Sequence, residues 1–263
     1  MSNKHQELRF DDIESCRLPG RVEEILFALD QERPDRTQIH VLDLGCGRGA
    51  HVFKLRQIGY STYGIDVDPN VVRNGQKLFN DHGLDHSSII KLVCPGSVWP
   101  FEDGFFDLVF SDQVFEHVSD LNGVIAEISR VTKAGGVSFH RFPAQFIRVE
   151  PHVFVPFVHW LPKVVLIRAV WLDIFYDRLP FWNGQERLGR RKRIHEFIEY
   201  LNRKTYYRSI DRYLRLFVKA GFTAKSDRPT GPSDWNLLSA SKQRIKSKYY
   251  STFISAEIIA VRC

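Results

Sequence analysis

The stretch VLDLGCGRGAHVF, residues 41–53, places three glycines at alternate positions between two apolar runs. Glycine inside a regular element costs about 1 kcal/mol relative to alanine, so the three indicate a backbone that turns tightly or closely approaches a ligand. An ordinary tight turn between a strand and a helix would also explain them. Asp66 ends a later apolar run, where its carboxylate can accept hydrogen bonds from a ribose diol. Because the pattern is G-x-G-x-G and not G-x-G-x-x-G, it favours a nucleoside ligand without a pyrophosphate.

Alternating strand-like and helix-like stretches must position these residues. Up to residue 143 the alternation is typical of parallel βαβ units, so we expect an α/β fold with a doubly wound sheet, whose ligands bind beyond the carboxyl ends of the strands. Strands are predicted over 39–45, 61–68, 89–96, 106–112 and 137–143, and helices over 21–31, 50–59, 69–83 and 121–136. Later elements are predicted as a helix over 206–222 and two strands, around 222–228 and 252–262, that pair as a hairpin.

Composition and charge narrow the class of protein. The chain has 263 residues, of which 43% are hydrophobic and 26% charged, as in globular proteins, and no apolar run is long enough to span a membrane. The polar start lacks a secretory signal, and the four scattered cysteines form no CxxC pair, so we expect a cytoplasmic protein without disulfides. Histidines and carboxylates show no metal-ligand spacing, and we therefore expect no metal. The net charge of +6 permits a phosphate-rich partner without requiring one.

Several ordered motifs together resemble the class I S-adenosylmethionine-dependent methyltransferases. VLDLGCGRG resembles the first motif of that family and GIDVDPN the second. The segments GSVWPFEDGFFDLVFSDQVFEHV and AEISRVTKAGGVSFHRFP are similar to its third to fifth strands, and YLRLFVKAGF is similar to its late helix. The resemblance implies a Rossmann-like, seven-stranded, mostly parallel sheet with an antiparallel last strand, S-adenosyl-L-methionine as cofactor, and methyl transfer as the activity.

The resemblance also implies which residues contact the cofactor. Gly45, with Gly47, would line its methionine part, and Asp43 would orient that loop. Asp66 would hold the ribose hydroxyls, while Ser97, where many relatives have aspartate, would meet the adenine edge. The full set of expected cofactor contacts is Asp43, Gly45, Cys46, Gly47, Asp66, Val67, Ser97, Val98, Asp112, Gln113 and His117.

Histidines are the candidate bases for methyl transfer. The reaction needs an aligned nucleophile and, for an alcohol or phenol, a group that removes a proton near neutral pH. His117, His140 and His152 are the catalytic candidates. Each also has a structural interpretation, as a helix cap, a buried histidine and a lid-packing residue respectively. The strand end SDQV lacks the Asn/Asp-Pro-Pro-aromatic pattern of amide or adenine-amino acceptors. We therefore expect O-methylation of a small-molecule or sugar hydroxyl, including glycans.

The chain is predicted to form one domain, 1–263, with a substrate-determining insertion. Its expected parts are an N-terminal helical segment (1–38), a cofactor-binding core (39–143), a helical cap (144–205) and a last helix with a strand pair (206–263). The apolar part of the cap, 144–183, is open to three interpretations: a lid, a dimer interface, or a surface for a lipid-linked acceptor with peripheral membrane contact through 153–182. We expect the acceptor to bind between this part and the ends of the fourth and fifth strands.

Two other functions stay open at this stage. The basic stretch 187–215 is dense enough to contact phosphates, which would suit an RNA methyltransferase, although it lacks the aromatic pattern of an RNA-binding motif. A solvated helical face is the alternative explanation of that stretch. A non-catalytic, S-adenosylmethionine-binding regulatory protein is the second possibility, and the intact glycine loop with Asp66 argues against it.

Overall fold

The computed structural model describes residues 16–83, 89–143, 145–182, 184–226 and 255–263. The beginning of the expected N-terminal segment, the end of the strand expected over 222–228 and the start of the one expected over 252–262 lie outside these residues. Within the described part, none of the helices is both long and apolar enough to cross a membrane.

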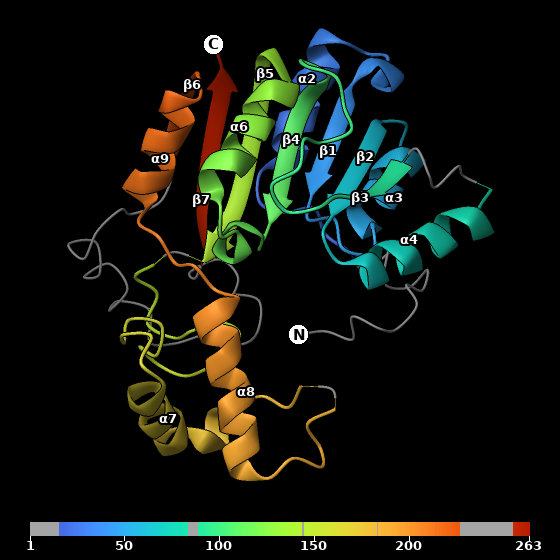
Figure 1. The fold of residues 1–263 in the computed structure, drawn as a ribbon. Coiled ribbons are helices and arrows are strands. Elements are labelled where there is room, and N and C mark those ends of the chain that lie inside the picture. Colours follow the sequence, from blue (N-terminus) through green and yellow to red (C-terminus); the bar gives the residue numbers. More distant parts are fainter. Residues whose placement is uncertain (1–15, 84–88, 144, 183, 227–254) are drawn as a thin grey trace, which may run out of the picture.

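A seven-stranded sheet forms the centre of the molecule, in the order β3-β2-β1-β4-β5-β7-β6 (Figure 1). Its strands are β1 (His40–Leu44), β2 (Ser61–Asp66), β3 (Ile90–Leu92), β4 (Phe106–Asp112), β5 (Thr132–Pro143), β6 (Phe222–Ser226) and β7 (Ser255–Arg262). The strands β1 to β5 pair in parallel, whereas β7 runs antiparallel to both β5 and β6. The expected Rossmann-like sheet with an antiparallel last strand is therefore confirmed.

Helices cover both faces of this sheet because its central strands alternate between two cores. Leu42 packs in one hydrophobic cluster with Ile125 and Phe217, and its neighbour Val41 packs in another with Leu26. The covering helices are α2 (Val22–Glu32), α3 (Ala50–Gln57), α4 (Pro69–Asp81), α6 (Leu121–Val131) and α9 (Ile210–Lys219). A 3₁₀ turn, η1 (Arg36–Gln38), precedes β1.

The strand predicted over 89–96 is shorter in the structure, Ile90–Leu92, and the boundaries of two predicted helices are wrong. The helix expected over 121–136 ends at Val131, because the backbone of Thr132 is extended. The hydroxyl of Thr132 donates to the Ile128 carbonyl at 2.6 Å. β5 therefore begins at Thr132 and pairs with β4 through an irregular register. The helix expected over 206–222 begins only at Ile210. The residues before it join the cap to the segment after β4, because the Tyr206 N–H donates to the Glu116 carbonyl at 2.6 Å.

The cap, residues 145–205, forms a second layer beyond the carboxyl ends of the parallel strands (Figure 1). Its helices are α7 (Val165–Ile174) and α8 (Arg190–Arg203), with a 3₁₀ turn, η3 (Tyr176–Arg178), between them. They share their own hydrophobic cluster, which includes Leu172 and Phe197. Residues 145–164 are loops held by one isolated bridge between Val149 and Pro156, so the cap is only partly helical.

Candidate functional site

The glycine loop links β1 to α3, and its three glycines have left-handed φ values of 72°, 56° and 80°. A Cβ on Gly45 would stand 2.4 Å from Cγ2 of Val114, and one on Gly49 would stand 2.3 Å from Cδ1 of Ile90. A Cβ on Gly47, in contrast, would meet nothing within 4 Å. Two of the glycines are thus required by packing, and the third leaves open space against bare backbone, which suits a closely packed ligand.

Asp66 lies at the end of β2, beside this open space. Its Oδ2 accepts the N–H of Gly47 at 2.8 Å, and its Oδ1 accepts the N–H of Asp68 at 2.9 Å. Each carboxylate oxygen has further acceptor capacity, so both can still accept a hydroxyl. The carboxylate therefore orders the loop and keeps acceptor capacity beside the open space at Gly47.

Asp43 carries a partner that the sequence analysis missed. It is buried near the end of β1, and its Oδ2 stands 3.4 Å from Nδ1 of His51, in the first turn of α3. Burial opposes a charge on His51, but hydrogen bonding and charge from Asp43, with a contribution from Cys16, raise its pKa to about 11. The pair ties β1 to the helix that follows the glycine loop. A histidine just after a glycine loop was the only sequence signal for this contact.

The residues expected around the adenine lie at the edge beyond β2 and β3. Val67 and Val98 have 56% and 73% of their surface exposed, which offers two apolar side chains to a ring. Ser97 donates its hydroxyl to the Cys94 carbonyl at 2.8 Å, so the Ser97 oxygen can act as an acceptor. The side chain of Cys46 is buried in the hydrophobic cluster around α3, so its expected cofactor contact stays a prediction for its backbone alone.

The end of β4 is fixed by an ion pair. Asp112 accepts two hydrogen bonds from Arg141 on β5, both at 2.7 Å. The next residue, Gln113, has a left-handed φ of 57° and donates its N–H to the Arg141 carbonyl at 2.8 Å. The Asp112 carboxylate that we expected near the cofactor is thus held by a cation, and about a fifth of its side chain is exposed.

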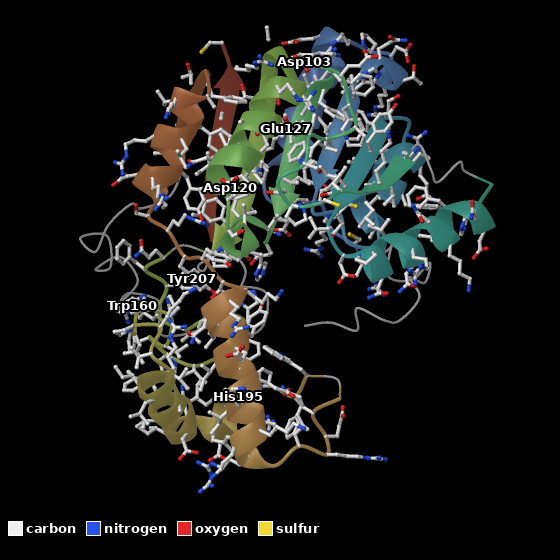
Figure 2. All side chains as sticks on the ribbon, in the orientation of Figure 1. Asp103, Asp120, Glu127, Trp160, His195 and Tyr207 are labelled. Atoms are coloured by element: carbon white, nitrogen blue, oxygen red, sulfur yellow. The ribbon has the colours of Figure 1, made fainter. Side chains whose placement is uncertain are left out.

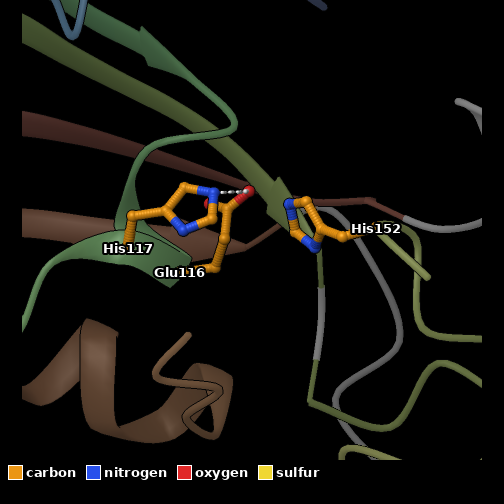
Figure 3. A group of neighbouring side chains, drawn as sticks. All are labelled: Glu116, His117 and His152. Atoms are coloured by element: carbon orange, nitrogen blue, oxygen red, sulfur yellow. Dashed lines mark ion pairs between the residues drawn. The ribbon is translucent and has the colours of Figure 1, made fainter. Parts of the chain in front are cut away.

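Glu116, His117 and His152 come together where the cap meets this strand end (Figure 3). Glu116 and His117 belong to the 3₁₀ turn η2 (Phe115–His117), directly after β4, whereas His152 comes from the cap. The two imidazole centroids are 5.0 Å apart. Burial raises the pKa of Glu116 to about 8. The structure therefore joins two of the three histidines that we predicted and adds a carboxyl group that we did not.

Glu150 anchors the cap side of this cluster. It is fully buried and accepts the N–H groups of His152 and Val153 at 2.8 and 2.7 Å, the ring Nδ1 of His152 at 2.7 Å, and the hydroxyl of Tyr207. Burial alone would raise the pKa of Glu150, but the hydrogen bonds from His152, Tyr207 and Val153 hold it below its usual value. Figure 2 places Tyr207 at the level where cap and sheet meet.

His140 does not face the site, which corrects our expectation for that residue. It is fully buried on β5, stacked on Phe115 at 4.2 Å, and its two ring nitrogens are bonded to the hydroxyls of Ser111 and Ser138 at 2.7 and 2.6 Å. Burial lowers its pKa to about 3. A neutral imidazole with both nitrogens engaged cannot take a proton from a substrate.

A cavity of about 490 Å³ lies at the same junction and has a cationic lining. Lys163, Arg168, Arg208 and Arg212 contribute to it. Lys163 donates to the carbonyls of Asn202 and Thr205, at 2.7 and 2.8 Å, so part of this charge holds the cap together.

Residues 42–139 match the protein family described as "Methyltransferase domain". Sterol 4-C-methyltransferase strm-1 of Caenorhabditis elegans is 32% identical over 37% of this chain and 29% of its own. The ubiquinone biosynthesis O-methyltransferase of Xanthomonas oryzae is 31% identical over 43% of this chain and 48% of its own. Phosphoethanolamine N-methyltransferase 2 of Haemonchus contortus, solved with S-adenosyl-L-methionine, shares the fold, with a TM-score of 0.51 and 14% identity over 92% of this chain and 52% of its own. The chain spans less than half the length of these two curated relatives.

Proposed function

By its domain over residues 42–139 the chain belongs to the class I S-adenosylmethionine-dependent methyltransferases, whose cofactor is S-adenosyl-L-methionine, and from this premise we propose that it methylates a hydroxyl group of a small molecule. The observation that carries the proposal is the juxtaposition at one sheet edge. A glycine loop with open space at Gly47 and the carboxylate of Asp66 lie beyond β1 and β2, and two imidazoles lie beyond β4.

The residues at the first three strands suit the cofactor. Asp66 would accept its ribose hydroxyls, and the backbone at Gly45 and Gly47 would line its methionine part. Val67 and Val98 would cover the adenine faces. When bound, the cofactor supplies a methyl group on a positively charged sulfur, which needs only an aligned nucleophile.

The residues at β4 and the cap suit the acceptor. His117 directs Nδ1 at the Lys204 carbonyl, 2.7 Å away, and His152 directs Nδ1 at Glu150, so in both neutral rings Nε2 carries the lone pair. Either Nε2 can take the hydroxyl proton while the oxygen forms its bond to the methyl carbon and the sulfur keeps the electron pair of the broken bond. We propose His117 and His152 as the catalytic candidates.

The exposed face of α7 supports an acceptor with an apolar portion. Its apolar side chains point outward from the cap, Leu166 with 72% of its surface exposed, and the most exposed of them are Val165, Leu166, Val170 and Ile174. Exposed cations lie nearby at Arg191 and Lys192, and this combination suits a lipid–water interface. Among the three interpretations of the cap, we propose contact with a lipid-linked or lipid-dissolved acceptor. The sterol and ubiquinone chemistry named for two relatives supports this class.

An RNA acceptor has less support. In the basic stretch, Arg193 is buried, with its guanidinium 3.9 Å from the Phe181 ring centre. Arg190 pairs with Asp173, and Arg203 pairs with Glu199. These cations therefore make contacts within the cap itself.

The four free cysteines are consistent with a reducing cytosol, which we propose as the compartment in which the protein works.

The test is transfer of a labelled methyl group. Purified protein is incubated with methyl-labelled S-adenosylmethionine and a cell extract, which is then separated into lipid, water-soluble and nucleic-acid fractions. We expect label in an alkali-stable product of the lipid fraction, with at least a tenfold loss in His117→Ala and His152→Ala together. Label in nucleic acid would support the RNA methyltransferase. Saturable cofactor binding with no labelled product in any extract would support the regulatory protein.

A further inference from the structure

The side chains of Glu116, His117 and His152 each point a metal-binding atom at one small region (Figure 3). These atoms, one from each residue, all lie within 4.8 Å of one another. We propose that the three side chains bind one divalent transition-metal cation of the Zn²⁺ and Co²⁺ class. The role that we give the metal below rests on the proposed methyl transfer, but the site itself does not.

Both imidazoles are oriented by acceptors on their far side. Nδ1 of His117 meets the Lys204 carbonyl at 2.7 Å, and Nδ1 of His152 meets the Glu150 carboxylate at 2.7 Å. A metal-binding histidine normally donates its other ring N–H to a carbonyl or a carboxylate, which fixes the tautomer and makes the ligating nitrogen more basic. Each of the two rings has that arrangement, and one comes from each side of the junction.

Glu116 provides an independent reason for a cation. It is fully buried, and neither carboxylate oxygen has a hydrogen-bond partner among the described residues. The nearest imidazole nitrogen, Nε2 of His117, is 3.8 Å away, too far for a hydrogen bond. Buried carboxylates are normally paired or bound to a metal. The hydroxyl of Tyr200, whose ring is 5.4 Å from that of His152, is likewise buried without a hydrogen-bond partner.

The spacing requires a small closure. Ligand atoms bound to one zinc ion stand about 3.3 Å apart, so the three atoms need to approach one another by at most about 1.5 Å. Glu116 and His117 are adjacent on η2, so their mutual position is largely set. The closure therefore amounts to side-chain rotations with a small shift of the loop that carries His152.

The donor set selects the metal class. Two imidazoles and one carboxylate suit zinc, cobalt and iron(II), whereas magnesium and calcium prefer an all-oxygen shell. Three protein ligands also leave a coordination position open, as in catalytic sites. The exposed fractions of the His117 and His152 side chains are 32% and 16%, so that position is accessible from outside.

An open metal position beside the methyl-transfer site would activate the acceptor. A metal held by these residues would lower the pKa of a bound hydroxyl, so that its proton would leave to solvent and the oxygen would keep the electron pair for attack on the methyl carbon. In this form of the mechanism His117 and His152 hold the metal and do not act as proton acceptors.

Metal binding is measured on the full chain without cofactor or acceptor. The protein is stripped with a chelator, dialysed against Zn²⁺ or Co²⁺, and assayed for bound metal and for the Co²⁺ absorption spectrum. We expect one ion per chain and a Co²⁺ spectrum of four- or five-coordination. Glu116→Gln and His117→Asn should each weaken binding at least tenfold. His195→Asn, which changes an exposed histidine on α8, is the matched control and should bind as the unmodified protein does.

Thermal unfolding shows whether each variant folds. Glu116→Gln is informative because this near-isosteric change removes no hydrogen bond between the carboxylate and the described residues. Absence of stoichiometric Zn²⁺ and Co²⁺ binding would overturn the proposal, as would equal binding in all variants or binding of Mg²⁺ alone. None of these results would contradict the proposed methyl transfer, in which an imidazole acts as the base. Conversely, a metal bound at these residues in a protein without transfer activity would contradict the proposed function only.

Discussion

The proposed cofactor side and the proposed acceptor side of the sheet edge are built in different ways. Beyond β1 and β2 the proposed cofactor side consists mainly of backbone turns and the carboxylates of Asp43 and Asp66, within residues 43–68, with Ser97 and Val98 added beyond β3. Beyond β4 it consists of side chains from η2 and the cap, which meet only because Glu150 and the Lys204 carbonyl hold two imidazoles in place. The cofactor side thus depends on local conformation, and the acceptor side depends on how the cap docks. A change on one side should leave the other largely intact.

The largest effect is expected for Gly45→Ala. The new Cβ would stand 2.4 Å from Val114 at a φ of 72°, which adds steric overlap to backbone strain. We expect the free energy of unfolding to fall by about 2–4 kcal/mol and cofactor binding to be lost. Gly83→Ala is the control, because its φ of 70° is equally unfavourable but a Cβ there meets nothing within 4 Å. It should cost only about 1 kcal/mol in chemical denaturation. Equal losses would mean that the contact with Val114 is unimportant.

Glu150→Gln should damage the acceptor side alone. The carboxylate accepts four donors, and an amide cannot satisfy the same set, so His152 loses its orientation. We expect a loss of about 2–4 kcal/mol in stability and a turnover at least tenfold lower, with cofactor affinity unchanged. Calorimetric titration and label transfer on the same preparation measure both. Glu199→Gln, which changes the ion-pair partner of Arg203 on α8, is the control and should alter neither turnover nor cofactor affinity. A parallel fall in cofactor affinity would show that the two sides are coupled.

Asp66→Ala should damage the cofactor side alone. Removal of a charged acceptor at the end of β2 should weaken S-adenosylmethionine binding by about 1–3 kcal/mol, through the lost ribose contact and the freed Gly47 N–H. Asp103→Ala removes a carboxylate with 80% of its side chain exposed and should leave affinity unchanged. Titration calorimetry separates the two variants. Unchanged binding in Asp66→Ala would exclude the ribose role.

His140 predicts a pH effect that belongs to the core and not to either side. Its pKa is lowered to about 3 in the folded chain, against about 6.5 when unfolded. Between these values the unfolded chain holds the extra proton, so stability is complete above pH 6.5 and falls by about 1.4 kcal/mol per pH unit below it. His140→Gln lacks this loss, and its deficit relative to the unmodified protein should shrink between pH 7 and pH 5 in denaturation experiments. A constant difference would place the titrating group elsewhere.

The smallest stability effect is expected on the outer face of α7. Leu166→Asp with Ile174→Asp changes exposed side chains, so unfolding should shift by no more than about 0.5 kcal/mol. Binding to vesicles that contain anionic lipid should fall at least tenfold if this face contacts a lipid surface. Lys225→Asp, on the edge strand β6, is a charge control distant in the fold. Unchanged vesicle binding in the double variant would contradict the lipid contact and would favour a lid or a dimer interface instead.

The sequence alone was sufficient to predict the turns of the glycine loop and the strand end at Asp66, because both depend on local conformation. Gly45, Gly47 and Gly49 mark turns that only glycine adopts readily, and Asp66 ends the next strand, so linear spacing carries the information. The order of strands and helices followed from hydrophobic periodicity for the same reason. The helix end at Val131 was missed, because a bulged start of β5 depends on pairing with β4.

Only the tertiary structure decided which side chains meet beyond the end of β4. His140 lies in a strand that is buried on both faces, so the alternation of apolar and polar residues does not predict whether its side chain is exposed. The hydroxyls of two buried serines, Ser111 and Ser138, form hydrogen bonds with both of its ring nitrogens. His117 and His152 are distant in the chain, and neither their spacing nor their neighbours predicts that they meet beside Glu116. The meeting depends on how the cap packs beyond β4, and such packing is set by the sum of many contacts between segments that are remote in sequence.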